Sequence, residues 1–298
     1  MQIGLIGLGK MGFNLALNLK RKEHDVITYD IDPATMKAIE EHQILTAGSL
    51  VQLTEKLSPK RAIWLMIPAG EIVDYMLAQL KDLLSEGDVI IDGGNSNYKD
   101  SIRRAGELKT LGIEFLDCGT SGGTDGALNG VCTMIGGPKH VFESCEEIFK
   151  SISLPGGYLR CGDTGAGHYT KMIHNGIEYG MMQAIAEGFE VLEQSGYDFD
   201  LAAIARLWNQ GSVVRSWLME LTESAFTKDP GLGAIKGVMH SSGEGKWTLE
   251  TALEKQIPTP VIALSVIMRY RSLQEETFAG KVVAALRNEF GGHSVVKK

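Results

Sequence analysis

The sequence predicts an α/β domain built on a doubly wound, Rossmann-type parallel sheet, followed by an all-α domain. In the first half of the chain, short apolar runs typical of strands alternate with helical patterns, as in a parallel sheet with crossover helices. A glycine-rich turn directly follows the first of these runs. Beyond Gly165 the strand pattern ends and long helical stretches follow. We therefore expect two domains, at residues 1–164 and 165–298.

The composition is typical of a globular protein, with 44% hydrophobic and 22% charged residues among 298. A net charge of −8 without a Lys/Arg run argues against a nucleic-acid surface. No segment approaches the ~20 apolar residues of a membrane span. The four cysteines lack paired or zinc-like spacing, so we expect reduced thiols and a cytoplasmic protein. We expect no metal site, because His168, His174 and His240 have no Cys or carboxylate at ligand spacing.

The individual elements follow from the apolar periodicity of each segment. We expect strands at residues 2–7, 25–30, 61–67, 88–92 and 113–118, with two further runs, 131–136 and 158–161, extending the sheet at its edge. Helices are expected between them at residues 11–22, 33–41, 71–84, 98–111 and 138–151. In the second domain we expect helices at residues 166–195, 201–210, 214–227, 249–255 and 260–289. The tail after them, residues 291–298, is expected to be mobile unless it docks on something.

The glycine-rich turn reads Gly7-Leu8-Gly9-Lys10-Met11-Gly12 and lies between the first strand and the first helix. Its glycines permit a tight turn, a close approach of the backbone to a pyrophosphate, and packing of the helix on the strand. The free N–H groups of the helix N-terminus would bind the anion. The motif, in this context, predicts an NAD-binding domain.

Asp30 and Asp32 favour NAD over NADP as the cofactor. Asp30 ends the second strand, where an acidic residue binds the adenosine ribose hydroxyls. A carboxylate accepts hydrogen bonds from this diol but repels a 2′-phosphate, and no arginine stands next to either residue. The alternative for Asp32 is a cap on the helix that starts at Pro33, which leaves Asp30 in its role.

Lys171, Asn175 and Glu178 are candidate catalytic residues. Their spacing of four and three places them on one face of a helix. At ~1.5 Å per residue, Lys171 and Glu178 lie roughly 10 Å apart along the axis, a separation that suits a base and an acid acting on different atoms of one substrate. Apolar neighbours such as Met172 and Ile173 predict a largely buried helix, in which polar groups need partners or a cleft. A solvated polar face is the alternative.

Two glycine-rich loops follow later strands, at the sheet edge where ligands bind in this fold class. One is residues 92–97, with Asn95 at its centre, and the other contains Ser121, Gly122 and Gly123. Ser121 and the backbone N–H groups after it suit a carboxylate. For either loop, the alternative is a turn that needs glycine only for its conformation.

These motifs resemble those of the decarboxylating 6-phosphogluconate dehydrogenases of the short type, within the β-hydroxyacid dehydrogenase superfamily. The resemblance runs from end to end and rests on Gly7–Gly12, Gly93–Ser96, Ser121–Gly123, Gly165–Gly180, Gly243–Trp247 and Arg287–His293. Its most specific part is the stretch from His174 to Gly180. Relatives that act on other β-hydroxyacids typically have a second Asn where this chain has Gly176, and they lack the pair Glu178-Tyr179.

The resemblance implies oxidation of the C3 hydroxyl of 6-phosphogluconate by hydride transfer to NAD, loss of carbon dioxide, and protonation of the enediol to ribulose 5-phosphate. In the family, the lysine matching Lys171 is the base and the glutamate matching Glu178 is the acid. Asn95 would contact both cofactor and substrate, and Tyr179 and Arg269 would hold the phosphate. The remaining substrate contacts would be Ser121, Gly122, Gly123, His174 and Asn175, together with Arg287 and His293 from the neighbouring subunit of a homodimer or homotetramer.

A lysine base must be neutral at working pH, well below its free pKa of ~10.4. Burial, the positive N-terminal end of the helix and the cationic nicotinamide all favour the neutral form of Lys171.

Two departures from the family concern the phosphate pocket. Long members have a lysine where this chain has Ser242, and their duplicated helical domain is absent here. Two alternatives to the leading hypothesis stay open. One is a β-hydroxyacid dehydrogenase for an unphosphorylated substrate, without decarboxylation, which has no use for Arg269, Arg287 and His293. The other is a non-catalytic NAD-binding sensor, which need not keep Lys171 and Glu178.

Overall fold

The computed structural model describes residues 1–297, and the chain divides into two compact units. The first unit comprises residues 1–175 and the second begins at Gly176. One long helix, α8 (Ala166–Glu193), begins in the first unit and continues into the second. The predicted boundary at Gly165 immediately precedes this helix. The expected order of an α/β domain followed by helices is confirmed.

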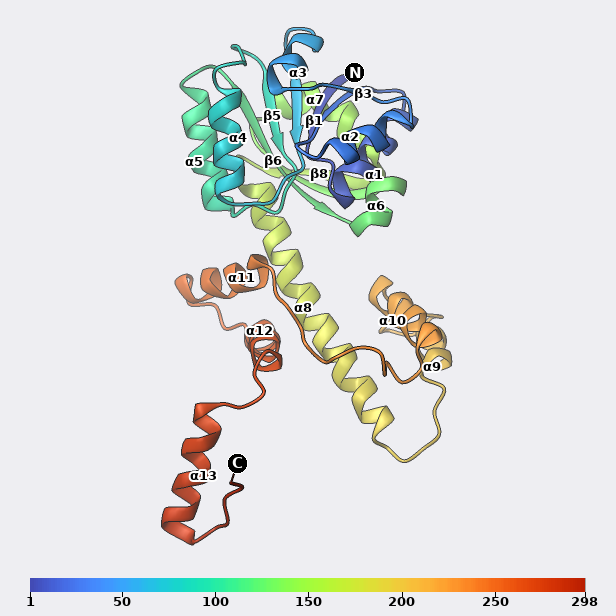
Figure 1. The fold of residues 1–298 in the computed structure, drawn as a ribbon, viewed down its shortest axis with the longest axis vertical. Helices are drawn as coiled ribbons and strands as arrows, with labels where there is room; N and C mark the ends of the chain where they lie inside the picture. Colours follow the sequence, from blue (N-terminus) through green and yellow to red (C-terminus); the bar gives the residue numbers. More distant parts are fainter. Residues whose placement is uncertain (298) are drawn as a thin grey trace. The chain divides into compact units, whose positions relative to one another are not determined.

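The first unit is built on one eight-stranded sheet with the order β3-β2-β1-β4-β5-β6-β7-β8 (Figure 1). The described pairs are parallel apart from β6 with β7, which is antiparallel. This confirms the predicted doubly wound sheet, with the two late runs at its edge. The strands are β1 (Gln2–Ile6), β2 (Asp25–Tyr29), β3 (Leu45–Thr46), β4 (Ala62–Leu65), β5 (Val89–Asp92), β6 (Glu114–Ser121), β7 (Val131–Gly136) and β8 (Ser153–Gly162).

The helices of the first unit lie on both faces of the sheet (Figure 1). They are α1 (Lys10–Arg21), α2 (Pro33–Glu40), α3 (Leu50–Lys56), α4 (Glu71–Leu80), α5 (Tyr98–Lys109), α6 (Gly123–Asn129) and α7 (Lys139–Ile152). Strand β3 and helices α3 and α6 were not predicted. They have two, seven and seven residues, too few for apolar periodicity to show.

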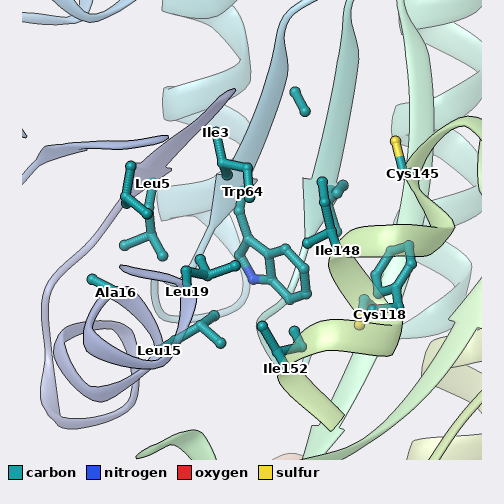
Figure 2. Packing of buried hydrophobic residues seen from close by; sticks show 14 of the residues in the cluster. Ile3, Leu5, Leu15, Ala16, Leu19, Trp64, Cys118, Cys145, Ile148 and Ile152 are labelled. Atoms are coloured by element: carbon teal, nitrogen blue, oxygen red, sulfur yellow. The ribbon is translucent and has the colours of Figure 1, made fainter. Parts of the chain in front are cut away.

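Two hydrophobic cores hold these layers together, one on each face of the sheet. The first lies under α1, α2 and α7, and the second under α3, α4 and α5. Trp64 of β4 is completely buried in the first core, and Figure 2 shows its ring between α1, with Leu15 and Leu19, and the α7 side chains Ile148 and Ile152. A Cβ atom added to Gly93 would lie 2.0 Å from the Trp64 Nε1 atom, so this loop position requires glycine.

The second unit consists of helices and their connections. After α8 come α9 (Leu201–Trp208), α10 (Trp217–Lys228), α11 (Gly243–Glu254), α12 (Pro260–Ser272) and α13 (Phe278–Gly291). The expectation of a single helix over residues 260–289 is wrong. The chain leaves the helix after Ser272, and Thr277 caps α13 by accepting a hydrogen bond from the Gly280 N–H at 3.0 Å.

Helix α13 buries none of its side chains within the described part of the chain. Its apolar residues Phe278 and Phe290 are 81% and 77% exposed. Apolar surface of this extent on a single helix is typical of a segment that packs against another molecule. Among residues 1–297, no helix combines the length and the apolar character needed to cross a membrane.

Candidate active site

The glycine-rich turn between β1 and α1 has the geometry that dinucleotide binding requires. Gly7 has φ +95°, which favours glycine. A Cβ atom on Gly12 would lie 2.0 Å from the Gly7 carbonyl oxygen, so the first turn of α1 packs directly on the turn. A cleft of about 600 Å³ opens in front of it, and its lining includes Leu8, Gly9 and Lys10. The N-terminus of α1 therefore faces a cleft that suits a pyrophosphate.

Asp30 and Asp32 lie beside this turn and have different roles. The Asp30 carboxylate accepts hydrogen bonds from the Leu8 N–H at 2.5 Å and from the Asp32 N–H at 2.8 Å. Asp32 caps α2, accepting from the Ala34 N–H and from the Thr35 hydroxyl, which lowers the pKa of its carboxyl. Asp32 is therefore the N-cap of α2, which was the alternative interpretation of this residue. Asp30 lines a second hollow, of about 580 Å³, between β2 and α2.

Lys171 is seated on β6 near the start of α8. It is 5% exposed, and a Cβ atom on Gly119 would lie 2.2 Å from the Lys171 Cβ atom. Asn175, one turn later, is also buried. The helix face is therefore covered at these two residues. The expectation of a largely buried helix is wrong for the later part of α8, where Ile177, Met181 and Val191 are 52%, 41% and 71% exposed.

A short hydrogen-bonded chain joins the Ser121 loop to the same helix. The Ser121 hydroxyl lies 3.3 Å from Nε2 of His174, and Nδ1 of His174 lies 3.0 Å from Oδ1 of Asn175. With Oδ1 of Asn175 as acceptor, the Nδ1–H group of His174 is the donor of this pair. The structure thus brings together three of the predicted substrate residues.

Asn95 stands exposed at the tip of a loop that rests on buried charges. Arg104 of α5 is 1% exposed and donates to the Asp74 carboxylate at 2.8 Å and to the Ser96 hydroxyl at 3.2 Å. Ser96 donates in turn to Asp92 at 2.7 Å. This network holds the loop in place through Ser96. Arg104 could not be found from the sequence, because its partners come from segments that are distant along the chain.

Asp117 of β6 is a second residue that the sequence did not reveal. Its carboxylate is completely buried and accepts hydrogen bonds from the N–H groups of Gly165 and His168, at 2.6 and 2.8 Å. It therefore caps α8 from a different element. A strand carboxylate can be assigned as a cap only when the fold places it at a helix end.

Within the second unit, Tyr179, Ser242 and Arg269 form one polar cluster. The Arg269 guanidinium lies 3.5 Å from the centroid of the Tyr179 ring. The Tyr179 hydroxyl lies 3.0 Å from the Ser242 hydroxyl and accepts from the Ser242 N–H at 3.1 Å. Gly245 must be glycine here, because its Cβ atom would lie 2.6 Å from the Tyr179 ring.

The remaining predicted residues of the second unit lie on α8 and α13. Glu178 is half-buried on α8. Arg287 lies on α13, and His293 follows its C-cap with its ring against Phe290, at 6.2 Å between centroids. Among the described contacts, none joins Arg287 or His293 to Tyr179 or Arg269 of the same chain.

Comparison with known proteins agrees with this geometry. Residues 2–162 match the family model for the NAD binding domain of 6-phosphogluconate dehydrogenase, and residues 167–295 match its C-terminal domain. Over all 298 residues of both chains, the sequence is 55% identical to Bacillus subtilis YqeC, provisionally named a 6-phosphogluconate dehydrogenase. It is 40% identical to the NAD(+)-dependent, decarboxylating 6-phosphogluconate dehydrogenase of Haloferax volcanii, covering 100% of this chain and 99% of that one.

Solved structures show the same relationship. The 6-phosphogluconate dehydrogenase of Plasmodium falciparum, studied with NADP+ and with 6-phosphogluconate, superposes with a TM-score of 0.85 at 31% identity. It covers 100% of this chain, which spans 66% of that longer one. A Mycobacterium tuberculosis 3-hydroxyisobutyrate dehydrogenase shares the fold, with a TM-score of 0.74 at 19% identity over 91% of this chain and 92% of that one. With both of its domains matched in sequence and structure, the chain belongs to the 6-phosphogluconate dehydrogenase family.

Proposed function

We propose that this protein catalyses the oxidative decarboxylation of 6-phosphogluconate to ribulose 5-phosphate with NAD as the hydride acceptor. The observation that carries the proposal is helix α8, which has Lys171 buried against β6 and Glu178 seven residues later on the same helix. An oxidation alone needs one base. A second proton-transferring group is needed when the oxidised product also loses carbon dioxide and must be reprotonated.

In this proposal Lys171 accepts the proton of the substrate's C3 hydroxyl through its Nζ atom. Bound NAD supplies the acceptor for the hydride that leaves C3. Asn175 and His174, already ordered by their mutual hydrogen bond and by Ser121, orient the substrate's hydroxyl and carboxylate groups. Glu178 then delivers a proton to the enediol that remains after carbon dioxide has left.

The preference for NAD is supported by the charge beside the ribose site. Asp30 is held by the Leu8 and Asp32 N–H groups and faces the hollow between β2 and α2. Ile31, next to it, is 85% exposed and uncharged, and Lys37, the basic residue that lines the hollow, lies there with the acidic Glu40. The Haloferax relative, named as NAD(+)-dependent, is consistent with this preference.

The phosphate end of the substrate is assigned to Tyr179 and Arg269, with Ser242 beside them. Arg287 and His293 would complete this pocket from a second copy of the chain, in a homodimer or homotetramer. The exposed apolar side chains of α13 support such an arrangement, since a second copy would cover them.

A second candidate is a dehydrogenase for an unphosphorylated β-hydroxyacid. The observation that favours it is Ser242, whose hydroxyl is engaged with Tyr179 and contributes no positive charge to a phosphate site. This candidate needs the base but not the acid. The two candidate functions therefore predict different effects of replacing Glu178.

The test uses Lys171→Met and Glu178→Gln in the full-length protein. Lys171→Met is expected to lose about 10²–10⁴ in kcat with 6-phosphogluconate while keeping its NAD affinity, because it removes only the base. Glu178→Gln is expected to lower product formation on a similar scale. Near-normal turnover in Lys171→Met would refute Lys171 as the base. Unchanged product formation in Glu178→Gln would favour the dehydrogenase for an unphosphorylated β-hydroxyacid.

A further inference from the structure

Asp117 places a full negative charge at the N-terminus of the helix that carries Lys171. Its two oxygens accept from the Gly165 and His168 N–H groups, which are among the donors that a helix start leaves unpaired. The carboxylate is completely buried between β6 and the start of α8. Gly136 and Gly167 pack directly on Asp117, and neither position has room for a side chain.

Strand β6 holds this carboxylate close to Lys171. Asp117 and Gly119 are two residues apart and lie on the same face of the strand, about 7 Å apart at ~3.3 Å per residue. Gly119 is the residue on which the Lys171 side chain packs, with 2.2 Å between the Lys171 Cβ atom and a Cβ atom added to the glycine. Asp117 and Lys171 are both at least 95% buried, so solvent screens the interaction between their charges weakly.

We propose that Asp117 is a positioning residue that also stabilises the protonated form of Lys171, and so sets the lowest pH at which this lysine acts as a base. The inference rests on the proposed function, in which Lys171 takes the hydroxyl proton. A helix N-terminus carries roughly half a positive charge and favours a neutral lysine. A buried carboxylate at that same N-terminus reverses the effect.

The expected size of this effect follows from Coulomb's law. As a general yardstick, opposite unit charges ~8 Å apart at an effective dielectric constant of ~20 shift a protonation equilibrium by roughly one to two pH units. Loss of the Asp117 charge therefore makes the neutral lysine available at lower pH.

Two ion pairs on neighbouring elements have charges that offset each other. Arg104 balances Asp92 at 3.6 Å, and Arg160 balances Asp163 at 2.7 Å. Burial raises the pKa of the Cys118 thiol, which therefore stays neutral. Charged and titratable groups on these elements include Glu114, Asp117 and Cys118 on β6, Asp92 on β5, Arg104 on α5, Arg160, Cys161 and Asp163 before α8, and His168, Tyr169, His174 and Glu178 on α8 itself.

The test is the pH dependence of kcat/KM for 6-phosphogluconate in wild type and Asp117→Asn. The midpoint of the acid limb is expected to move to lower pH by about one unit in the variant, with NAD affinity unchanged. Asp117→Glu, which keeps the charge, should retain the wild-type midpoint. Asp163→Asn is the matched control, because this carboxylate also lies near the start of α8 but is 98% exposed and paired with Arg160.

The outcomes separate the inference from the proposed function. Wild-type protein that does not oxidise 6-phosphogluconate refutes the proposed function before any variant is compared. With an active wild type, an unmoved acid limb in Asp117→Asn, or a loss of kcat at every pH without a shift, refutes the electrostatic role and leaves Asp117 as a helix cap. Asp117→Ser, which is neutral and smaller, provides the same measurement if the asparagine variant does not fold.

Discussion

The guanidinium group of Arg269 stacks on the ring of Tyr179, with its central carbon 3.5 Å from the ring centroid. This cation–π contact joins α12 to α8, while the hydroxyl of the same tyrosine bonds to Ser242 at the start of α11. One Arg269 nitrogen also donates to the His240 carbonyl at 2.8 Å. The arginine is thus held in one orientation, which would reduce the entropy lost if it binds the substrate phosphate, as proposed.

Arg269→Met is expected to raise KM for 6-phosphogluconate by about 10-fold to 100-fold, because under the proposed function it removes a charge-assisted hydrogen bond to the phosphate. The effect on kcat should be smaller. Arg271→Met is the control, since Arg271 lies on the same helix and donates to the Gln274 carbonyl at the helix end. Steady-state kinetics of both variants make the comparison, and equal KM values would contradict the phosphate assignment.

The cofactor preference should reverse with two substitutions at the end of β2. Asp30→Asn combined with Ile31→Arg removes a negative charge and adds a positive one beside the ribose. We expect the ratio of kcat/KM for NADP to that for NAD to rise by at least about 10-fold. Ile31→Gln, which adds length without charge, should leave the ratio near its wild-type value. A wild-type enzyme that already prefers NADP would overturn the role given to Asp30.

Gly93→Ala is expected to destabilise the first unit by about 3 kcal/mol or more, because its Cβ atom would overlap the buried Trp64 ring at 2.0 Å. Gly106→Ala provides the control. It lies within α5 with no atom within 4 Å of an added Cβ, so it should be neutral or slightly stabilising. Urea unfolding followed by Trp fluorescence measures both. Similar stability of the two variants would show that the loop can move away from Trp64.

Acid should weaken the fold through Asp74. Arg104 and then Arg103 hold the pKa of this carboxyl at about 2, below its unfolded value of ~3.9. A depressed folded-state pKa contributes stability above the unfolded value, and this stability is lost as pH falls from about 4 towards 2. Asp74→Asn should flatten the slope of unfolding free energy against pH in this window. The exposed Asp82→Asn is the control, and identical slopes in all three proteins would disprove the role of Asp74.

The sheet and its long helices could be predicted because each element carries its own signal. Apolar runs such as the one at β4 and the glycine-rich turn after β1 are local features, and the fold follows from their alternation. Helix α3 and the antiparallel pairing of β6 with β7 could not be predicted, since the first is short and the second depends on tertiary context. The break between α12 and α13 was missed because apolar residues continue on both sides of it.

The candidate site divides in a similar way. Lys171, Asn175 and Ser121 belong to local motifs and could be named from the sequence. Asp117 and Arg104 act through contacts with segments that are distant along the chain, and only the fold reveals them. From the sequence, the helix N-terminus is expected to favour a neutral Lys171, whereas the structure places a buried carboxylate at that N-terminus.

The most direct test of the central claim follows NADH and carbon dioxide together when the wild-type protein is given 6-phosphogluconate and NAD. We predict one carbon dioxide released for each NADH formed, with ribulose 5-phosphate as the remaining product. NADH formation without carbon dioxide would show an oxidation that does not lead to decarboxylation. That result would contradict the assignment of Glu178 as the acid of a second proton transfer.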